Sequence, residues 1–228
     1  MAFSDFLNTI NKKPIRVLDA SIENSKYIPL NLSKNNKELF NVDVSSSKRL
    51  GDYINSHISK HKGLIAFGGY KEVRSIYKRS LHFNNKILSE RDIHLGVDLW
   101  SEVGTSIYSP IDGIVHSFKN NRNYGDYGPT IILKHDINNN IFYTLYGHLS
   151  IESINSIKVG QVFKKGDVLA FLGNAEVNGD YPPHLHFQII KDIQDYVGDY
   201  PGVCSKKDLE FYVANCPDPN LLLKIEKE

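Results

Sequence analysis

The stretch "DIHLGVDLW", residues 92–100, places an imidazole and a carboxylate where they could bind a divalent metal ion. His94 and Asp98 alternate with apolar residues, a pattern typical of a half-buried strand whose polar face points away from the core. On a straight strand the two residues would lie about 13 Å apart, at about 3.3 Å per residue, which is too far for one metal ion. A shared site therefore requires a bend, which we expect at Gly96.

A second stretch, "PPHLHFQII", shows the same alternation near the end of the strand-rich region. His184 and His186 share one predicted strand face, and apolar residues share the other. A third imidazole, His148, follows a glycine at the end of the strand-like stretch "YTLYGHLS". Two histidines and a carboxylate are a common ligand set for a divalent metal with one open coordination position.

The elements that must position these residues are mainly short strands. From Gly63 onward, short apolar stretches separated by turns such as "GDYGP" and "INNN" predict a mostly β fold with short flanking helices. We expect an antiparallel β-sheet groove or a small β-sandwich. The pattern divides the chain into an N-terminal extension (1–62), a β domain (63–195) and a C-terminal tail (196–228).

Helices are expected only outside the β region. A short helix is predicted at "SDFLNTINKK", capped by Ser4, and a second at residues 48–60, where apolar residues recur at helical spacing. In the tail, Ser205 and Asp208 fit a capping box at the start of a helix in "SKKDLEFYVANC".

Six blocks of the sequence together resemble the M23 family of zinc metallopeptidases, the lysostaphin-like or LytM-type enzymes. The blocks occur in family order between residues 93 and 190, and they read "IHLGVDLW", "GTSIYSPIDGIVHS", "GDYGPTIILKH", "YTLYGHLS", "VGQVFKKGDVLAFLG" and "PPHLHFQI". Six ordered blocks are far more specific than a single His-x-His pair. The resemblance implies an antiparallel β-sheet groove with zinc on its floor.

The resemblance also implies a role for each candidate residue. His94, Asp98 and His186 would be the Zn²⁺ ligands, and His148 and His184 the catalytic histidines. The implied activity is that of a zinc metalloendopeptidase acting on cell-wall (peptidoglycan) peptides or glycine-containing peptides. Zinc would activate a water molecule, assisted by the two histidines. Which histidine is the general base stays open.

One loop departs from the family pattern, and other functions compete with a peptidase. The segment "GNAEVNGDYPP" before the His-x-His pair is longer and more acidic than the family's turn, which puts the substrate preference in question.

One alternative to a peptidase is a zinc-retaining binding or regulatory domain that does not catalyse, with its groove closed by the N-terminal residues. Another is a histidine phosphotransfer module, which would tolerate Asp98→Ala. A non-haem iron site typically has one residue, not three, between its histidine and its carboxylate.

The composition restricts the kinds of partner that the protein can be expected to bind. The 228 residues carry 27 basic and 26 acidic side chains, so the net charge of +1 gives no basis for nucleic-acid binding. No apolar run approaches membrane length and no signal-peptide pattern opens the chain. We therefore expect a cytoplasmic protein unless a leader has been removed or export is unusual.

Cys204 and Cys216 are interpreted as buried thiols rather than a disulfide. The oligomeric state is open.

The remaining histidines are interpreted as partly buried structural residues. His57 and His61 are spaced as a metal pair on the predicted helix, but no third ligand is evident. His82, His116 and His135 receive the same interpretation. Tyr77 and Arg79 precede the first proposed ligand, and a packing or surface role is expected for them rather than a role in the groove.

Overall fold

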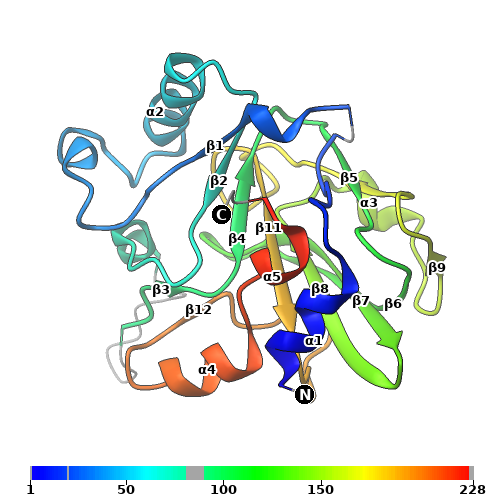
Figure 1. Cartoon of the computed structure of the whole chain (residues 1–228). Coiled ribbons are helices and arrows are strands. Elements are labelled where there is room, and N and C mark those ends of the chain that lie inside the picture. The colour runs from blue at the N-terminus through cyan, green and yellow to red at the C-terminus, as the bar shows by residue number, and fades with distance from the viewer. Residues whose placement is uncertain (1, 20, 81–89, 226–228) are drawn as a thin grey trace.

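The computed structural model describes residues 2–19, 21–80 and 90–225 (Figure 1). The strands are β1 (Tyr27–Pro29), β2 (Ile65–Gly68), β3 (Ile93–His94), β4 (Val97–Trp100), β5 (Ser106–Tyr108), β6 (Gly113–Asn121), β7 (Gly128–Ile137), β8 (Asn140–Gly147), β9 (Val162–Phe163), β10 (Val168–Phe171), β11 (His184–Ile190) and β12 (Val203–Cys204). The helices are α1 (Phe3–Ile10), α2 (Ser47–Lys60), α3 (Glu152–Asn155), α4 (Leu209–Asn215) and α5 (Asn220–Leu223), with 3-10 turns η1 (Asn24–Lys26), η2 (Lys37–Asn41) and η3 (Ser75–Arg79). The predicted mostly β fold is confirmed.

One large sheet organises the molecule. Its strand order is β1-β2-β4-β11-β8-β7-β6-β9, and two-stranded sheets β10–β5 and β12–β3 flank it. The pair β1–β2 is parallel, and the other pairs in the large sheet are antiparallel. Because β1 comes from the expected N-terminal extension, that segment contributes a strand to the same sheet as the proposed metal ligands.

The apolar face of β4 and β11 lies against the main core. Leu99, Leu185 and Phe187 are fully buried there, as strand alternation predicts. Helices α1 and α5 contribute to this core and lie side by side (Figure 1). The opposite face is thereby left for the polar side chains of the same strands.

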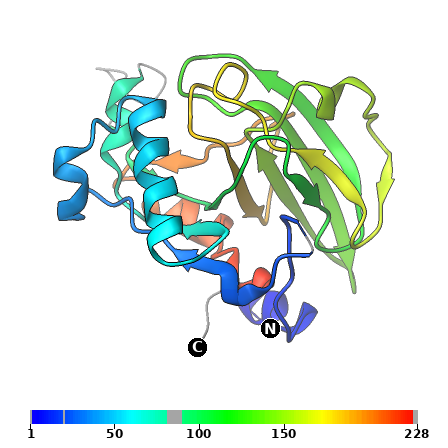
Figure 2. The same cartoon turned by 90° about the horizontal axis from the view of Figure 1, so that it is seen from above.

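A second apolar cluster covers part of that opposite face. Leu50 and Ile54 of α2 belong to the same cluster as Ala66 of β2 and Trp100 of β4. Figure 2 shows α2 on the side of the molecule away from the long strands β6, β7 and β8. The N-terminal residues thus pack over one end of the sheet's functional face.

The starts of two helices differ from the sequence predictions. Helix α1 begins after Ala2 and has no side-chain cap, so the prediction of a Ser4 cap is wrong. Ser205 and Asp208 do bond to each other, but they form a turn, and α4 begins only at Leu209. Helices α3 and α5 were not anticipated, and α3 lies inside the β region, where no helix was expected; α2 follows the prediction closely.

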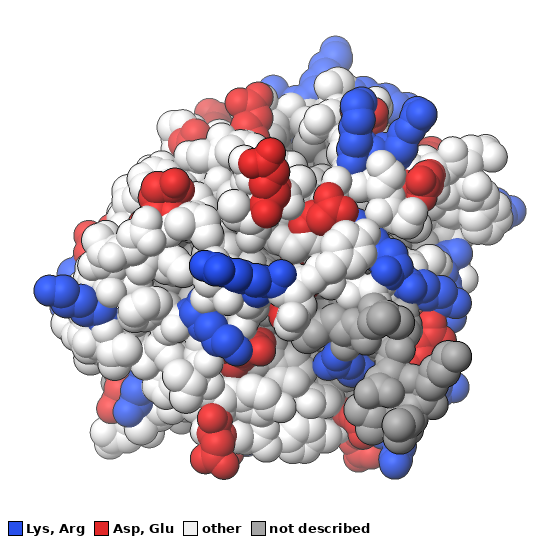
Figure 3. All heavy atoms as spheres, turned by 180° about the vertical axis from the view of Figure 1, so that it is seen from behind, with Lys and Arg blue, Asp and Glu red and all other residues white. Residues whose placement is uncertain are grey.

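Acidic and basic side chains are interspersed on the face seen in Figure 3, over the residues that the structure describes. Within the described part of the chain, no helix has both the length and the apolar character needed to cross a membrane.

Candidate metal centre

A bend of the chain between β3 and β4 brings His94 and Asp98 together. The two strands belong to different sheets and are separated by Leu95 and Gly96, so the predicted bend is confirmed. A Cβ atom on Gly96 would lie 2.6 Å from the imidazole of His186 and 2.8 Å from the carbonyl oxygen of Phe187. Only glycine leaves room for His186 at this position.

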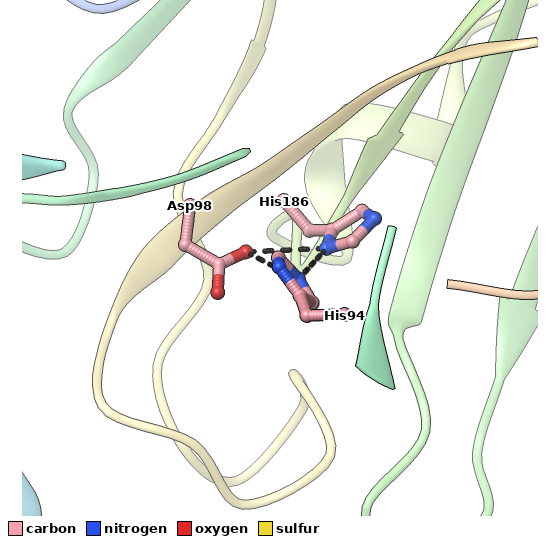
Figure 4. A group of neighbouring side chains, drawn as sticks. All are labelled: His94, Asp98 and His186. Atoms are coloured by element: carbon pink, nitrogen blue, oxygen red, sulfur yellow. Dashed lines mark hydrogen bonds and ion pairs between the residues drawn. The ribbon is translucent and has the colours of Figure 1, made fainter. Parts of the chain in front are cut away.

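Three donor atoms meet where the strands converge (Figure 4). His94 Nε2 lies 2.8 Å from His186 Nδ1 and 3.3 Å from Asp98 Oδ1, and His186 Nδ1 lies 3.1 Å from the same carboxylate oxygen. Asp98 and His186 face each other in the β4–β11 register. Donors around a tetrahedral zinc ion, with bonds of about 2.1 Å, lie about 3.4 Å apart. The cluster therefore has nearly the dimensions of a zinc site.

Hydrogen bonds on the far side of each ring fix which nitrogen is unprotonated. His94 Nδ1 donates to the carbonyl oxygen of Gly69 at 3.0 Å, and His186 Nε2 donates to Gln188 Oε1 at 2.9 Å. In a neutral imidazole the other nitrogen then carries the lone pair. Two lone pairs and the Asp98 carboxylate oxygen therefore converge on one point, which is the chemistry of a cation site.

Burial and charge favour the protonation states that metal binding requires. All three side chains of the cluster are buried. Burial lowers the pKa of His94 to about 3, so its ring is neutral near neutral pH. Burial alone would raise the pKa of the Asp98 carboxyl, but His94 and Arg74 together hold it well below its usual range. Near neutral pH the cluster therefore contains a neutral His94 ring and an ionised Asp98 carboxylate.

Arg74 is a member of the site that the sequence did not reveal. Its Nη1 atom lies 2.5 Å from Asp98 Oδ2, and its Nε atom lies 2.8 Å from Glu72 Oε2. The side chain is 4% exposed. Glu72 in turn accepts a hydrogen bond from the backbone N–H of Leu32 at 3.2 Å. Arg74 thus holds the second oxygen of the carboxylate and links it to the N-terminal segment.

His148 and His184 lie beside the three donor atoms. Their ring centroids are 4.2 Å apart, and His184 Nε2 is 3.8 Å from Asp98 Oδ1. His148 Nδ1 donates to the carbonyl oxygen of Asn178, and His184 Nδ1 to that of Pro182, each at 2.7 Å. Burial lowers the pKa of both rings. In each neutral ring, Nε2 is therefore the nitrogen that can accept a proton.

The backbone and neighbouring rings hold these two histidines in place. His148 has a φ of 64°, in the left-handed region, and its N–H and C=O are bonded to Tyr127 and Gly173. Such strained backbone persists where surrounding bonds fix it. The indole of Trp100 stacks on His184 at 5.7 Å, so the orientation of the His184 ring is set by the next strand.

The five residues singled out as ligands or catalytic groups thus lie in one cavity. Tyr77 also lines that cavity, whereas the ring-stacked pair His57 and His61 lies on α2. His61 is exposed, which contradicts its expected partial burial, and His82 lies outside the described residues.

The other singled-out side chains lie away from the donor atoms. His135 is buried and bonded to Thr144, and His116 is half-buried. Cys204 and Cys216 are free and buried, which agrees with the prediction of buried thiols.

Comparison with known proteins links this geometry to one family. The model of peptidase family M23 matches residues 92–197. Among curated proteins, an L-Ala--D-Glu endopeptidase of Bacillus subtilis is 33% identical over 107 residues, which cover 45% of this chain and 31% of that protein. The peptidoglycan DD-endopeptidase ShyA of Vibrio cholerae is 33% identical over 127 residues, 53% of this chain and 27% of that protein. The matches span a third or less of these relatives.

Solved structures with similarity to the chain include two peptidases. The catalytic domain of lysostaphin from Staphylococcus simulans is 24% identical, with a TM-score of 0.37 over 53% of this chain and 80% of that one. A zinc-containing peptidase from Vibrio cholerae is 28% identical, with a TM-score of 0.35 over 46% and 29% of the two chains. The family match therefore lies at residues 92–197, and it agrees with the resemblance to peptidase family M23 that the six sequence blocks indicate.

Proposed function

We propose that this protein is a zinc-dependent metallopeptidase in which His94, Asp98 and His186 bind the metal. The observation that carries the proposal is the convergence of two unprotonated imidazole nitrogens and one carboxylate oxygen, 2.8–3.3 Å apart, inside a buried cavity. Zinc bound by three protein ligands supplies Lewis-acid polarisation of the scissile carbonyl and lowers the pKa of water.

His148 and His184 would carry the proton transfers. Each ring donates through Nδ1 to a backbone carbonyl, so Nε2 is available to take a proton from the attacking water and to deliver it to the leaving amine. Burial lowers the pKa of both histidines, which keeps Nε2 unprotonated before the reaction. Two adjacent neutral rings also allow one to act as a base while the other donates to the developing oxyanion.

The names of the curated relatives support cell-wall peptides as the substrate class. The relatives in Bacillus subtilis and Vibrio cholerae carry the names of an L-Ala--D-Glu endopeptidase and a peptidoglycan DD-endopeptidase. We propose that the protein hydrolyses peptide bonds of this kind. Leu50 of α2 lines the cavity that holds the proposed ligands, which favours one second candidate, a zinc-retaining domain that binds peptides without cleaving them.

Metal analysis of matched variants tests the proposal. Elemental mass spectrometry should find about one zinc per chain in the unaltered protein, and Asp98→Ala should lose it because only two neutral ligands remain. Asp136→Ala, which removes an exposed carboxylate on β7, should retain the metal. His148→Ala and His184→Ala should keep zinc and lower the rate of peptide cleavage by about 10²- to 10⁴-fold.

Two outcomes would contradict the assignment. Zinc retained by Asp98→Ala would remove Asp98 from the ligand set and favour the phosphotransfer alternative. Zinc bound stoichiometrically without cleavage of any cell-wall or glycine-containing peptide would favour the binding domain.

A further inference from the structure

The loop before β11 is hydrogen-bonded to both of the proposed catalytic histidines. His148 Nδ1 donates to the carbonyl oxygen of Asn178, and His184 Nδ1 donates to that of Pro182, each at 2.7 Å. Both carbonyls belong to the segment 178–182, which is part of the loop "GNAEVNGDYPP" that departs from the family pattern. One short segment therefore constrains the direction in which each Nε2 atom points.

The ring of Tyr181, within this segment, contacts both imidazoles. Its centroid lies 5.0 Å from that of His148 and 5.8 Å from that of His184, with interplanar angles of 67° and 78°. Edge-to-face arrangements of this kind are favourable between aromatic rings. The two imidazoles are only 4.2 Å apart, and Tyr181 is buried. Neither imidazole can therefore turn freely while the Tyr181 ring is in place.

Tyr181 is itself fixed at its backbone and at the end of its side chain. Its N–H donates to Asn178 Oδ1 at 2.9 Å, and its carbonyl oxygen accepts from Asn178 Nδ2 at 3.1 Å. Its hydroxyl donates to the carbonyl oxygen of Gly125 at 2.8 Å. Because the Asn178 carbonyl also accepts from His148, one buried residue locates both the tyrosine and an imidazole that it contacts.

Arg79 packs against the Tyr181 ring. The guanidinium carbon lies 4.3 Å from the ring centroid, and the Arg79 side chain is 4% exposed. A guanidinium held over an aromatic face away from water is a favourable contact. Arg79 also donates to the carbonyl oxygens of Asp180 at 2.6 Å and Ser45 at 3.0 Å. Arg79 thus supports the Tyr181 ring and attaches the loop to the N-terminal residues.

We propose that Tyr181 is a positioning residue, whose ring holds the two proposed catalytic histidines in the orientation that proton transfer requires. The inference rests on the proposed peptidase function and adds a residue that acts through the histidines. The three proposed metal ligands are held instead by Gly69, Gln188 and Arg74. Removal of the Tyr181 ring should therefore slow the chemical step and leave zinc in place.

The test compares kcat and KM of the zinc-loaded full chain and its Tyr181→Leu variant on soluble cell-wall peptides. We expect kcat per zinc-loaded chain to fall about 10- to 100-fold, because misplacing a catalytic group by about 1 Å can cost about 100-fold. Tyr181→Phe keeps the ring and should recover most of this loss. Tyr143→Leu is the matched control, since it removes a ring 5.1 Å from His116, away from the donor atoms, and should leave kcat unchanged.

Three kinetic outcomes would overturn the inference. A raised KM with unchanged kcat would show that Tyr181 only lines the cavity and contacts the substrate. Loss of zinc from a folded Tyr181→Leu variant would show that the ring supports the whole site rather than the two histidines. A Tyr181→Phe variant as slow as Tyr181→Leu would assign the effect to the hydroxyl and its bond to Gly125.

Nuclear magnetic resonance of the histidine rings tests the same inference without activity. The ring ¹⁵N shifts distinguish a protonated from an unprotonated nitrogen, so His148 and His184 should each show a protonated Nδ1 and an unprotonated Nε2. In Tyr181→Leu we expect both rings to show a mixture of the two tautomers, and in Tyr181→Phe the original signals. Failure to cleave any peptide would refute the peptidase function, whereas unchanged ring signals in Tyr181→Leu would overturn the positioning role.

Arg79→Gln provides a variant that keeps every atom of Tyr181. Loss of the guanidinium should lower kcat by about two- to tenfold, with zinc retained, because the ring stays but is held less firmly. Arg122→Gln, at an exposed position, is the matched control and should leave kcat unchanged. If Tyr181→Leu does not fold, this variant decides the question, and an unaltered kcat together with unaltered ring signals in Arg79→Gln would overturn the inference.

Discussion

The carboxylate of Asp98 makes a different contact with each of its two oxygens. Oδ1 faces His94 and His186, and Oδ2 is held by Arg74 at 2.5 Å. Because the arginine occupies Oδ2, only Oδ1 is available to a metal ion, and its direction is fixed. Partners of this kind orient metal ligands, and losing them typically lowers metal affinity about 10- to 100-fold.

We therefore expect Arg74→Gln to weaken zinc binding by about 10- to 100-fold. Competition with a chelator measures the affinity directly, without reference to activity. Arg122→Gln, at an exposed position, is the matched control and should bind zinc normally. Arg74→Lys keeps the charge but not the geometry of the guanidinium, so an intermediate affinity is expected. Normal affinity in a folded Arg74→Gln variant would show that the ion pair does not orient Asp98.

For single residues, the sequence predicted the proposed ligands better than the side chains that hold those ligands in place. His94 and Asp98 could be placed on a polar strand face because strand alternation is a local property, and the family resemblance supplied their roles. Arg74 lies in "KEVRSIYKR", which has no strand or helix periodicity, and its contact with Asp98 depends on the folding of a turn 24 residues earlier in the chain. No local pattern marks such a contact.

The bend between β3 and β4 is the element that brings two of the proposed metal ligands, His94 and Asp98, together. A methyl group at Gly96 would lie 2.6 Å from the His186 ring, closer than van der Waals contact permits. We expect Gly96→Ala to destabilise the fold by about 1–3 kcal/mol through overpacking and to lower zinc occupancy. Urea unfolding and elemental analysis measure the two effects.

Gly51 is the matched control for that substitution. It lies inside α2, and an added Cβ would stand 3.7 Å from Pro182, an ordinary contact. Alanine is favoured over glycine in a helix interior by about 1 kcal/mol, so Gly51→Ala should stabilise the protein and keep its zinc. Normal zinc occupancy in Gly96→Ala would show that the bend tolerates a side chain and that its glycine is not required for the site.

Elements whose sequence has a clear strand or helix periodicity were predictable. Elements whose ends depend on contacts with other residues were not. Strand β11 and helix α2 follow their alternating and helical patterns. The late start of α4 depends on the turn contact between Ser205 and Asp208, which replaces the predicted first helical turn, and the short α5 follows no sequence period. That α2 would cover Trp100 could not be read from either sequence segment alone, because the contact joins residues far apart in the chain.

At the scale of the whole molecule, the N-terminal residues and the region that matches the family model are joined. They share the large sheet and the second apolar cluster. Strand β1 extends the edge of the sheet that holds Asp98, and Ile54 of α2 belongs to the same cluster as Trp100. Elements that share a core in this way unfold together. We therefore expect a single thermal transition, with helix content from circular dichroism and Trp100 fluorescence changing over the same temperature range.

A core substitution in α2 makes that expectation quantitative. Ile54 is 2% exposed, so Ile54→Ala should cost about 2–5 kcal/mol of unfolding free energy, and it should shift the circular dichroism and Trp100 curves equally. Ile141→Ala, at a position that is 47% exposed on β8, is the matched control and should shift neither appreciably. If the N-terminal residues were a separate unit resting on the sheet, Ile54→Ala would advance the loss of helix signal alone. The Trp100 transition would then stay at its original temperature.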